Sequence, residues 1–298
     1  MASRSPWSDP VDHLLALDPG RRGIAGFFTP GAALGAARAL RPARRVLIVT
    51  GFSVEAGMPE TDGPPGAAVL GRALRRLGAT VHYATDPVCV PVLAAALKTL
   101  DEPPDVAAYP DDADAAGQVL ARERPTHLVA IERPGRSRSG DYLNARGHSI
   151  AAWTRPIDAL FLARRGARPG PVTIGIGDGG NEVGMGNVRA RLAREGALTA
   201  RIASVVRTDH LVVAGVSNWG AYGVVAHLGR LAGRPLLHDA ALESRLIAAC
   251  VAAGASDGLT RRREPTVDGL SAATHAAVVT LLGLSWGPPP GRKGASQA

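Results

Sequence analysis

Short apolar runs alternate with longer stretches rich in Ala, Leu and Arg along most of this sequence. The runs at 46–50, 80–84, 127–131, 172–176 and 202–206, with a sixth at 211–214, are predicted strands. They are apolar nearly throughout, and not only at every second position, which is typical of parallel strands buried on both faces. Alternation of such strands with helices predicts an α/β fold, a layered α/β/α arrangement around a mostly parallel sheet.

The stretches between these runs have the length and composition of helices. Predicted helices cover 31–40, 65–77, 91–100, 113–124, 155–163, 181–194, 217–232, 240–253 and 267–282. A segment rich in Pro and Asp at 101–114 is predicted to be a surface loop. No linker divides the sequence, so residues 1–298 are predicted to form a single α/β domain with mobile ends at about 1–18 and 287–298.

Composition excludes several classes of protein. Hydrophobic residues make up 46% and charged residues 20% of the chain, which is typical of a globular protein with a large core. The net charge of +8 comes almost wholly from Arg, and aromatic residues are only 4%, so the charge favours small anions over nucleic acid. Cys89 and Cys250 form no disulfide or zinc motif. No signal peptide or membrane-spanning run is found, so a cytoplasmic location without a membrane partner is expected.

The densest glycine cluster directly follows the predicted strand at 172–176. It reads GIGDGGNE over residues 175–182 and leads to Asn187. Glycines let a ligand approach the backbone closely, and the free amides at the start of the predicted helix 181–194 suit an anion. The sequence therefore predicts a site for an anion or another polar ligand at this turn.

Asp178 and Glu182 within this turn stand four residues apart and would share one face of a helix. Two carboxylates so placed suit a base and an acid, or a divalent cation such as Mg²⁺. Helix capping by Asp178 or Asn181 is the structural alternative. The glycines also match GxGxxG, but the acidic residue that supports a dinucleotide site about 20 positions later is missing.

A second polar segment follows the predicted strand at 127–131. Glu132 comes directly after this strand, at the edge of the sheet where ligands of parallel α/β proteins bind. Arg133 and Arg136 come next, and their guanidinium groups suit either a substrate carboxylate or surface ion pairs.

Two further segments carry polar residues at predicted helix starts. Thr61 and Asp62 precede the helix predicted at 65–77, and Ser217 and Asn218 begin the helix predicted at 217–232. Side chains of these types cap helices, and they also orient amino-acid ligands. Both interpretations stay open for each pair.

The run TIGIGDGGNEVGMGN at 173–187 resembles the signature of the D-glutamate cyclase-like family. The segments PETDGPPGA at 59–67, ERPG at 132–135 and GVSNWGAY at 215–222 look like further motifs of that family in the same order. The resemblance implies conversion of D-glutamate to 5-oxo-D-proline with loss of water. Larger members of the family carry an additional amino-terminal region that resembles a hydro-lyase domain, and nothing in this sequence corresponds to it.

The chemistry of this cyclisation suggests a role for each polar segment. An acid, a base and a group that stabilises an oxyanion are needed. The predicted catalytic residues are Asp178, Glu182 and Glu132. The predicted substrate-binding residues are Gly177, Gly179, Gly180, Asn181, Asn187, Arg133, Arg136, Asp62, Thr61, Ser217 and Asn218. Among them, the amides of Gly179 and Gly180 are expected to hold a carboxylate or oxyanion.

The expected partner is a small acidic amino acid, and no redox cofactor is required. A divalent cation such as Mg²⁺, held by Asp178 and Glu182, stays open, as does a homo-oligomer. The alternative functions are a non-catalytic binding module for an acidic metabolite or nucleotide and, less favoured, a dinucleotide-dependent enzyme.

Overall fold

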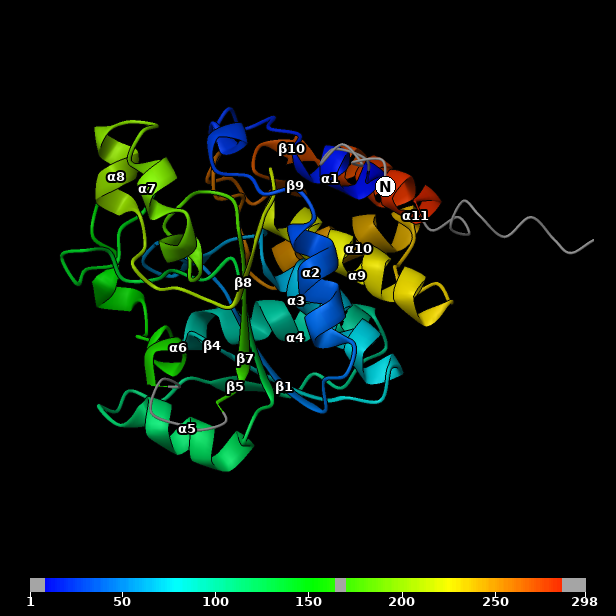
Figure 1. The fold of residues 1–298 in the computed structure, drawn as a ribbon, viewed down its shortest axis with the longest axis horizontal. Coiled ribbons are helices and arrows are strands. Elements are labelled where there is room, and N and C mark those ends of the chain that lie inside the picture. The colour runs from blue at the N-terminus through cyan, green and yellow to red at the C-terminus, as the bar shows by residue number, and fades with distance from the viewer. Residues whose placement is uncertain (1–8, 164–169, 286–298) are drawn as a thin grey trace, which may run out of the picture.

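A six-stranded sheet forms the centre of the computed structural model, which describes residues 9–163 and 170–285 (Figure 1). The strand order is β5-β4-β1-β6-β7-β8, and every neighbouring pair is parallel. The strands are β1 (Arg45–Thr50), β4 (Thr80–Thr85), β5 (Val106–Ala108), β6 (His127–Ile131), β7 (Val172–Gly177) and β8 (His210–Val213). Because all six are parallel, their carboxyl ends lie at one edge of the sheet. The predicted layered α/β fold is confirmed.

Helices and two small hairpins complete the described chain. The hairpins pair β2 (Ser53–Glu55) with β3 (Met58–Pro59) and β9 (Thr266–Val267) with β10 (Leu270–Ser271). The α-helices are α1 (Pro10–Leu15), α2 (Ala32–Leu40), α3 (Pro64–Arg76), α4 (Val90–Thr99), α5 (Ala115–Glu123), α6 (Ala159–Ala163), α7 (Arg189–Leu192), α8 (Ala197–Ile202), α9 (Ser217–Ala232), α10 (Ala240–Ala252) and α11 (Ala272–Leu284). Short 3₁₀ turns lie at η1 (Ile24–Gly26), η2 (Pro87–Cys89), η3 (Ala151–Trp153) and η5 (Met185–Asn187).

The two faces of the sheet are covered unequally. Side chains of β1 alternate between the faces, with Ile48 in the larger core cluster and Leu47 in the smaller one. The larger cluster includes residues of α1 to α4 and of α9 to α11, whereas the smaller includes residues of α5 and α6. Figure 1 shows α5 and α6 apart from the group that contains α2, α3 and α9. Burial of the sheet on both faces explains why its strands are apolar throughout.

Several predicted element boundaries are wrong. Residues 202–206 form no strand, since Ile202 ends α8 and the segment that follows is a loop. Residues 181–194 form turns, η5 and the short α7 in place of one helix, because Gly180 and Gly184 adopt φ of 99° and 104°, which an α-helix excludes. The predicted surface loop at 101–114 contains the edge strand β5.

Two other differences lie at the start and the end of predicted helices. The helix predicted at 155–163 is shorter, since α6 begins at Ala159. The helix predicted at 267–282 begins later, at Ala272, because Asp268 and Gly269 form the positive-φ turn of the β9–β10 hairpin. Ser271 caps this helix by accepting a hydrogen bond from the amide of Thr274.

The amino-terminal stretch is ordered over the residues that the structure describes. Helix α1 buries Val11 and Leu15 in the larger core cluster, and the Gly215 amide donates to the Leu15 carbonyl at 2.9 Å. The stretch predicted to be a mobile end at 1–18 therefore contains a helix, and its mobility stays a prediction. The tail predicted at 287–298 lies outside the described residues. No helix within 9–163 or 170–285 is both long and apolar enough to cross a bilayer.

Candidate active site

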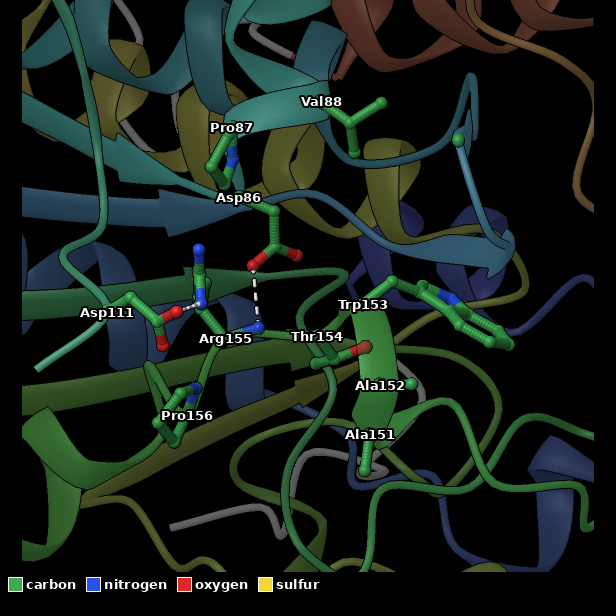
Figure 2. A pocket seen from close by; sticks show the side chains of 11 residues that line it. Asp86, Pro87, Val88, Asp111, Ala151, Ala152, Trp153, Thr154, Arg155 and Pro156 are labelled. Carbon is green, nitrogen blue, oxygen red and sulfur yellow. Dashed lines mark hydrogen bonds and ion pairs between the residues drawn. The ribbon is translucent and has the colours of Figure 1, made fainter. Parts of the chain in front are cut away.

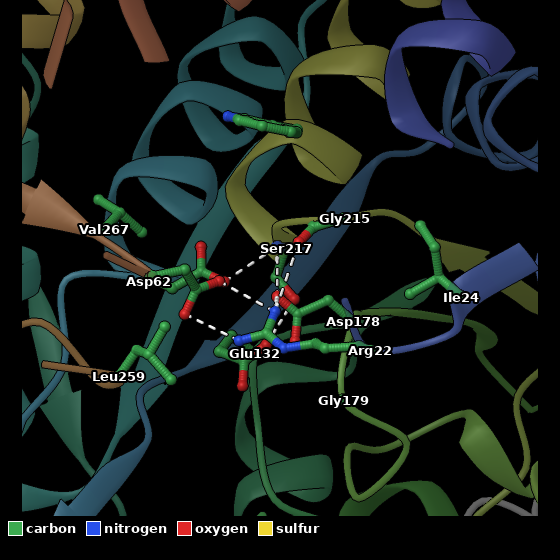
Figure 3. A network of polar contacts seen from close by, with 12 residues as sticks. Arg22, Ile24, Asp62, Glu132, Asp178, Gly179, Gly215, Ser217, Leu259 and Val267 are labelled. Atoms are coloured by element: carbon green, nitrogen blue, oxygen red, sulfur yellow. Dashed lines mark hydrogen bonds and ion pairs between the residues drawn. The ribbon is translucent and has the colours of Figure 1, made fainter. Parts of the chain in front are cut away.

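Three buried carboxylates meet at the carboxyl edge of the sheet (Figure 3). Asp62 precedes α3, Glu132 directly follows β6, and Asp178 directly follows β7. One carboxylate oxygen from each lies within 4.8 Å of those of the other two. The three residues are between 2% and 6% exposed, so this is an acidic site inside the protein and not a patch on its surface.

The start of α9 lies between these carboxylates and donates to all three. The Ser217 amide donates to Asp62 Oδ2 at 2.9 Å and to Asp178 Oδ2 at 3.2 Å, and the Asn218 amide donates to Asp62 Oδ1 at 2.8 Å. The Ser217 hydroxyl donates to Glu132 Oε2 at 2.5 Å. These contacts place negative charge at the positive end of a 16-residue helix, which stabilises it there.

Arg22 is the cation that contacts this cluster within the described part of the chain. Its Nη1 lies 2.5 Å from Asp178 Oδ2, and its Nη2 lies 2.9 Å from Asp268 Oδ1. The Arg22 side chain is 25% exposed, so its guanidinium reaches both the buried cluster and solvent. Glu60, two residues before Asp62, is also buried, and its Oε1 has no hydrogen-bond partner among the residues that the structure describes.

Burial raises the pKa values of the cluster. It raises the pKa of Asp62 to about 7, with the nearby Asp268 carboxylate adding to the shift and the α9 amides opposing it. Burial also raises the pKa values of Glu132 and Asp178 well above their ordinary range. Neighbouring carboxylates add to both of these shifts, and Arg22 opposes the shift at Asp178. Closely spaced buried carboxylates resist full ionisation, so the cluster favours shared protons or a bound cation.

Glu132 has an unusual backbone conformation. Its φ is 43°, in the left-handed region that side chains other than glycine rarely adopt, and its amide donates to the Ile176 carbonyl at 3.1 Å. Such a conformation costs on the order of 1 kcal/mol or more and is found most often at functional sites. Here it directs the carboxylate of a residue at a strand end towards α9.

The amides of the glycine turn contact a carboxylate of the chain itself. The amides of Asp178 and Gly179 donate to Glu182 Oε1 at 3.2 and 2.6 Å, and the Gly180 amide donates to Glu182 Oε2 at 2.7 Å. The amides expected to hold a substrate anion therefore hold the chain's own carboxylate. Glu182 does not join the group of Asp62, Glu132 and Asp178, and it shares no helical face with Asp178.

This arrangement also bears on the dinucleotide interpretation. In dinucleotide-binding proteins the glycine-rich turn presents free amides at the start of a helix. Here Glu182 occupies these amides, and turns follow in place of a helix. The GxGxxG match therefore reflects a closed turn.

The remaining predicted residues of the turn hold neighbouring loops. Asn181 Nδ2 donates to the Leu143 carbonyl at 2.7 Å, and Asn187 Nδ2 donates to the Thr208 carbonyl at 2.8 Å. Gly177 ends β7, and a Cβ placed there would crowd Glu182 and Met185. These contacts are with the protein itself.

Arg133 is fully buried, and its guanidinium is already paired. It donates to Asp86 Oδ2 at 2.5 Å, to Asp86 Oδ1 at 3.1 Å and to the carbonyls of Gly51 and Arg155. Asp86, Thr154 and Arg155 line a separate cavity of about 520 Å³, in which Arg155 pairs with Asp111 (Figure 2). Arg133 therefore supports the wall of that cavity and is not free for a substrate carboxylate.

Arg136 is likewise paired within the protein. Its Nε and Nη2 donate to the two oxygens of Asp158 at 2.8 and 3.0 Å, in a bidentate ion pair. The Tyr142 hydroxyl donates to the same carboxylate at 2.5 Å. The expectation that Arg133 or Arg136 clamps a substrate carboxylate is not supported by their contacts.

The polar residues at the starts of α3 and α9 divide between the two interpretations. Asn218 Oδ1 accepts from the amides of Gly63 and Gly66 at 3.0 and 2.8 Å, and so caps α3. The Thr61 hydroxyl donates to the Thr266 carbonyl at 2.8 Å. These two residues contact the protein itself, whereas Asp62 and Ser217 belong to the acidic site.

The predicted site residues do not include three that lie at or beside this site, which are Arg22, Glu60 and Asp268. Arg22 lay between the end predicted to be mobile at 1–18 and the helix predicted at 31–40, and Asp268 lay in a stretch predicted to be helical. A signal was present for Asp268, because Asp-Gly is a common turn pair. No local signal marks Arg22, whose partner Asp178 is far away in the sequence.

The comparison with protein families decides which family this chain belongs to. The model described as "D-glutamate cyclase-like, C-terminal" matches residues 11–283. The chain belongs to this family. The matched range contains Arg22, the three clustered carboxylates and Asp268, so the whole acidic site lies within the family's domain.

Among curated proteins, the D-glutamate cyclase of human mitochondria is 38% identical over 236 residues. The aligned part covers 73% of this chain and 38% of the human protein, so this D-glutamate cyclase-like chain spans well under half of that relative. The cytoplasmic location expected from the sequence stays a prediction.

Solved structures give weaker likenesses. The exonuclease RecJ bound to manganese aligns with 84% of this chain and 46% of its own length, at 14% identity and a TM-score of 0.41. An exopolyphosphatase-related protein from Bacteroides fragilis aligns with 88% and 58%, at 10% identity and a TM-score of 0.39. Both TM-scores are below 0.5, so neither likeness bears on function.

Proposed function

We propose that this chain converts D-glutamate to 5-oxo-D-proline and water, as a hydro-lyase. The observation that carries the proposal is the family match over residues 11–283, together with 38% identity to a D-glutamate cyclase. The buried acidic site adds chemical support, because the reaction needs groups that accept and donate protons.

The reaction forms one bond and breaks another. The substrate's α-ammonium group loses one proton, and the amine attacks the carbon of the side-chain carboxyl group. A C–N bond forms, the nitrogen loses a second proton, and one carboxyl oxygen takes up two protons and leaves as water when its C–O bond breaks. Holding the substrate in a bent conformation lowers the barrier further, because orientation is a large part of the cost of ring closure.

Glu132 and Asp178 suit the two proton transfers. Each is buried beside other carboxylates, so one can be ionised and accept the amine proton while the other is protonated and donates to the leaving hydroxyl. The Ser217 hydroxyl, which donates to Glu132, holds that carboxylate in place. Asp62 adds negative charge that attracts the substrate's ammonium group.

Arg22 suits the substrate's carboxylate. It is partly exposed, and it contacts Asp178 and Asp268 at the acidic site. A guanidinium group pairs well with a carboxylate, and Arg133 and Arg136 are both occupied elsewhere. In this proposal Arg22 takes the role that the sequence had suggested for those two residues.

Turnover is the direct test. The purified chain is incubated with D-glutamate, and 5-oxoproline is followed by chromatography against L-glutamate and protein-free controls. We expect product from D-glutamate above the spontaneous rate, and strong loss of product with Asp178→Asn. The exposed Glu264→Gln serves as a control that keeps activity. Absence of product above the spontaneous rate would remove the proposal for this chain.

A binding module without catalysis is a distinct outcome of the same experiment. Thermal stabilisation by D-glutamate without turnover would support it, because a ligand that binds only the folded state raises the unfolding temperature. In that case we expect Asp178→Asn to weaken the thermal stabilisation by D-glutamate, with no turnover in either the wild type or the variant.

A further inference from the structure

We infer that Asp62, Glu132 and Asp178 form a binding site for one hard divalent cation, such as Mg²⁺ or Mn²⁺, for which the Arg22 guanidinium competes. A catalytic role for this cation rests on the proposed function, but binding of the cation can be measured without substrate. This site differs from the pair of Asp178 and Glu182 that the sequence suggested, since the Glu182 carboxylate accepts hydrogen bonds from the amides of the glycine turn.

The ligand atoms are suitably placed. One carboxylate oxygen from each of the three residues lies within 4.8 Å of the others, and the residues come from three different segments of one sheet edge. Asp62 Oδ2 and Glu132 Oε2 each accept one hydrogen bond within the described chain. A carboxylate oxygen has two lone pairs, so each of these oxygens keeps capacity for a cation.

Glu60 gives a second, independent indication. It is about nine-tenths buried, and its Oε1 has no hydrogen-bond partner within the described chain. Glu60 lies two residues before Asp62, in the same segment that leads into α3 at this edge of the sheet. Capping of α9 explains Asp62, but it leaves Glu60 unexplained. A buried acceptor without a donor is costly unless a cation or its bound water satisfies it.

The charge balance favours the same conclusion. Three carboxyl groups meet within 4.8 Å, and Arg22, which contacts Asp178 and Asp268, is the cation that reaches them among residues 9–163 and 170–285. A divalent cation would offset the negative charge of closely spaced carboxylates that have left water.

The donor set selects the kind of cation. The group of three contains carboxylate oxygens and neither His nor Cys. Oxygen-only sites suit Mg²⁺, Mn²⁺ and Ca²⁺, whereas Zn²⁺ sites usually include nitrogen or sulfur. Bound there, the cation would act as a Lewis acid towards a carboxyl oxygen of the substrate.

Arg22 occupies part of the same negative field. Its Nη1 lies 2.5 Å from Asp178 Oδ2, which also accepts from the Ser217 amide, so both lone pairs of that oxygen are in use. Asp268 holds the other side of the guanidinium, and offers it a place when a cation takes Asp178. Removing the Arg22 charge should therefore strengthen cation binding.

Mn²⁺ binding tests the inference without any substrate. The chelator-treated chain is titrated with Mn²⁺, and the sharp electron paramagnetic resonance signal of the free ion is followed. We expect about one bound Mn²⁺ per chain, at least tenfold weaker binding in Glu132→Gln and Asp178→Asn, and several-fold tighter binding in Arg22→Gln. Glu264→Gln is the matched control, and circular dichroism checks that each variant folds.

The outcomes separate this inference from the proposed function. No binding by the wild-type chain at millimolar Mn²⁺ would overturn the site, and binding unchanged in Glu132→Gln and Asp178→Asn would mean an adventitious ion only. Weaker Mn²⁺ binding in Arg22→Gln than in the wild type would contradict the inference that Arg22 competes with the cation. Turnover of D-glutamate in the presence of chelator would support the proposed function and show that no cation is required for it. Mn²⁺ binding without turnover would support the cation site and contradict the proposed function.

Discussion

Glu132 is the residue at which backbone strain and chemistry coincide. A glycine would adopt its φ of 43° without cost, yet the chain places a glutamate there and directs its carboxylate to Ser217. Its surroundings raise the pKa of that carboxyl group, so a neutral side chain of the same shape fits the site at least as well. Strain and burial are therefore tolerated for the sake of the carboxylate.

Glu132→Gln should separate stability from activity. The amide keeps the shape and can still accept from the Ser217 hydroxyl, so we expect an unfolding temperature equal to or above that of the wild type. Loss of a proton-transferring group typically costs about 10²-fold or more in rate, and we expect that loss in 5-oxoproline formation. Activity within tenfold of wild type, in a variant as stable as the Glu264→Gln control, would show that Glu132 moves no proton.

Glu182→Gln should have the opposite profile. The Glu182 carboxylate accepts three backbone amides, and a Gln side chain has one acceptor oxygen and an NH₂ group that would face an amide donor. We expect a loss of about 2 kcal/mol in the free energy of unfolding, measured by urea denaturation. Unchanged stability together with lost turnover would instead return Glu182 to the catalytic group.

The sequence predicted where the site lies better than what each residue does there. Asp62, Glu132, Asp178 and Ser217 could be placed together because they lie next to strand ends or a helix start on one sheet edge. The occupant of the glycine amides could not be predicted, since capture of Glu182 depends on turns that local propensity leaves undetermined. Arg22 was missed for a similar reason, because only tertiary packing brings it to the cluster.

At the scale of elements, the amino-terminal segment and α9 depend on each other. Gly215, just before α9, donates its amide to the Leu15 carbonyl, and the same packing brings Arg22 to Asp178. A Cβ on Gly215 would collide with the carbonyl of Leu17, which is backbone and cannot rotate away. The position therefore requires glycine for close approach.

Gly215→Ala should displace the segment that carries Arg22. Overpacking of this kind typically costs about 1–3 kcal/mol, so we expect a lower unfolding temperature and a loss in turnover. Gly283→Ala in α11 is the matched control, because a Cβ there meets no atom within 4 Å and alanine favours a helix. If Gly215→Ala were as stable as Gly283→Ala, the segment would not be packed as described.

Prediction of helices and strands succeeded for long periodic segments, and it failed where a short strand or turn sets the limits of an element. Helix α9 was predicted with its observed limits, Ser217–Ala232, although its N-cap residue, Val216, makes no side-chain capping hydrogen bond. The edge strand β5, with three residues, is too short to be recognised within a Pro- and Asp-rich segment. The β9–β10 hairpin was absorbed into a predicted helix, because the pattern that follows it is helical.

At the scale of the whole molecule, the layered parallel fold followed from the apolar strands, but the strand order did not. Parallel strands joined by helices can be arranged in several orders, and β5-β4-β1-β6-β7-β8 depends on which helix packs against which face. Burial shifts the pKa values of two of the fold's buried ionisable groups in opposite directions, Asp62 in the acidic site and His227 in α9.

Asp62 and His227 change the stability of the fold in opposite directions as pH changes. Asp62, with its pKa raised to about 7, binds a proton in the folded state that the unfolded state has lost, so its contribution falls as pH rises from about 4 through 7. Burial lowers the pKa of His227 to about 4, so the unfolded state binds the proton first, and the contribution of His227 falls as pH drops from about 6.5 through 4. Between pH 4 and 7 the two effects partly cancel.

Single substitutions should therefore tilt the pH profile in opposite ways. As pH rises from 4.5 to 6.5, we expect the free energy of unfolding to fall more steeply in His227→Leu than in the wild type, and less steeply in Asp62→Asn. The wild type should gain up to about 3 kcal/mol over His227→Leu across this range, since each unit of pKa shift corresponds to about 1.4 kcal/mol. Urea denaturation at several pH values measures this, with His148→Leu as the exposed control. Parallel profiles for wild type and His227→Leu would mean that His227 is protonated alike in both states, and that acid stability is set by other groups.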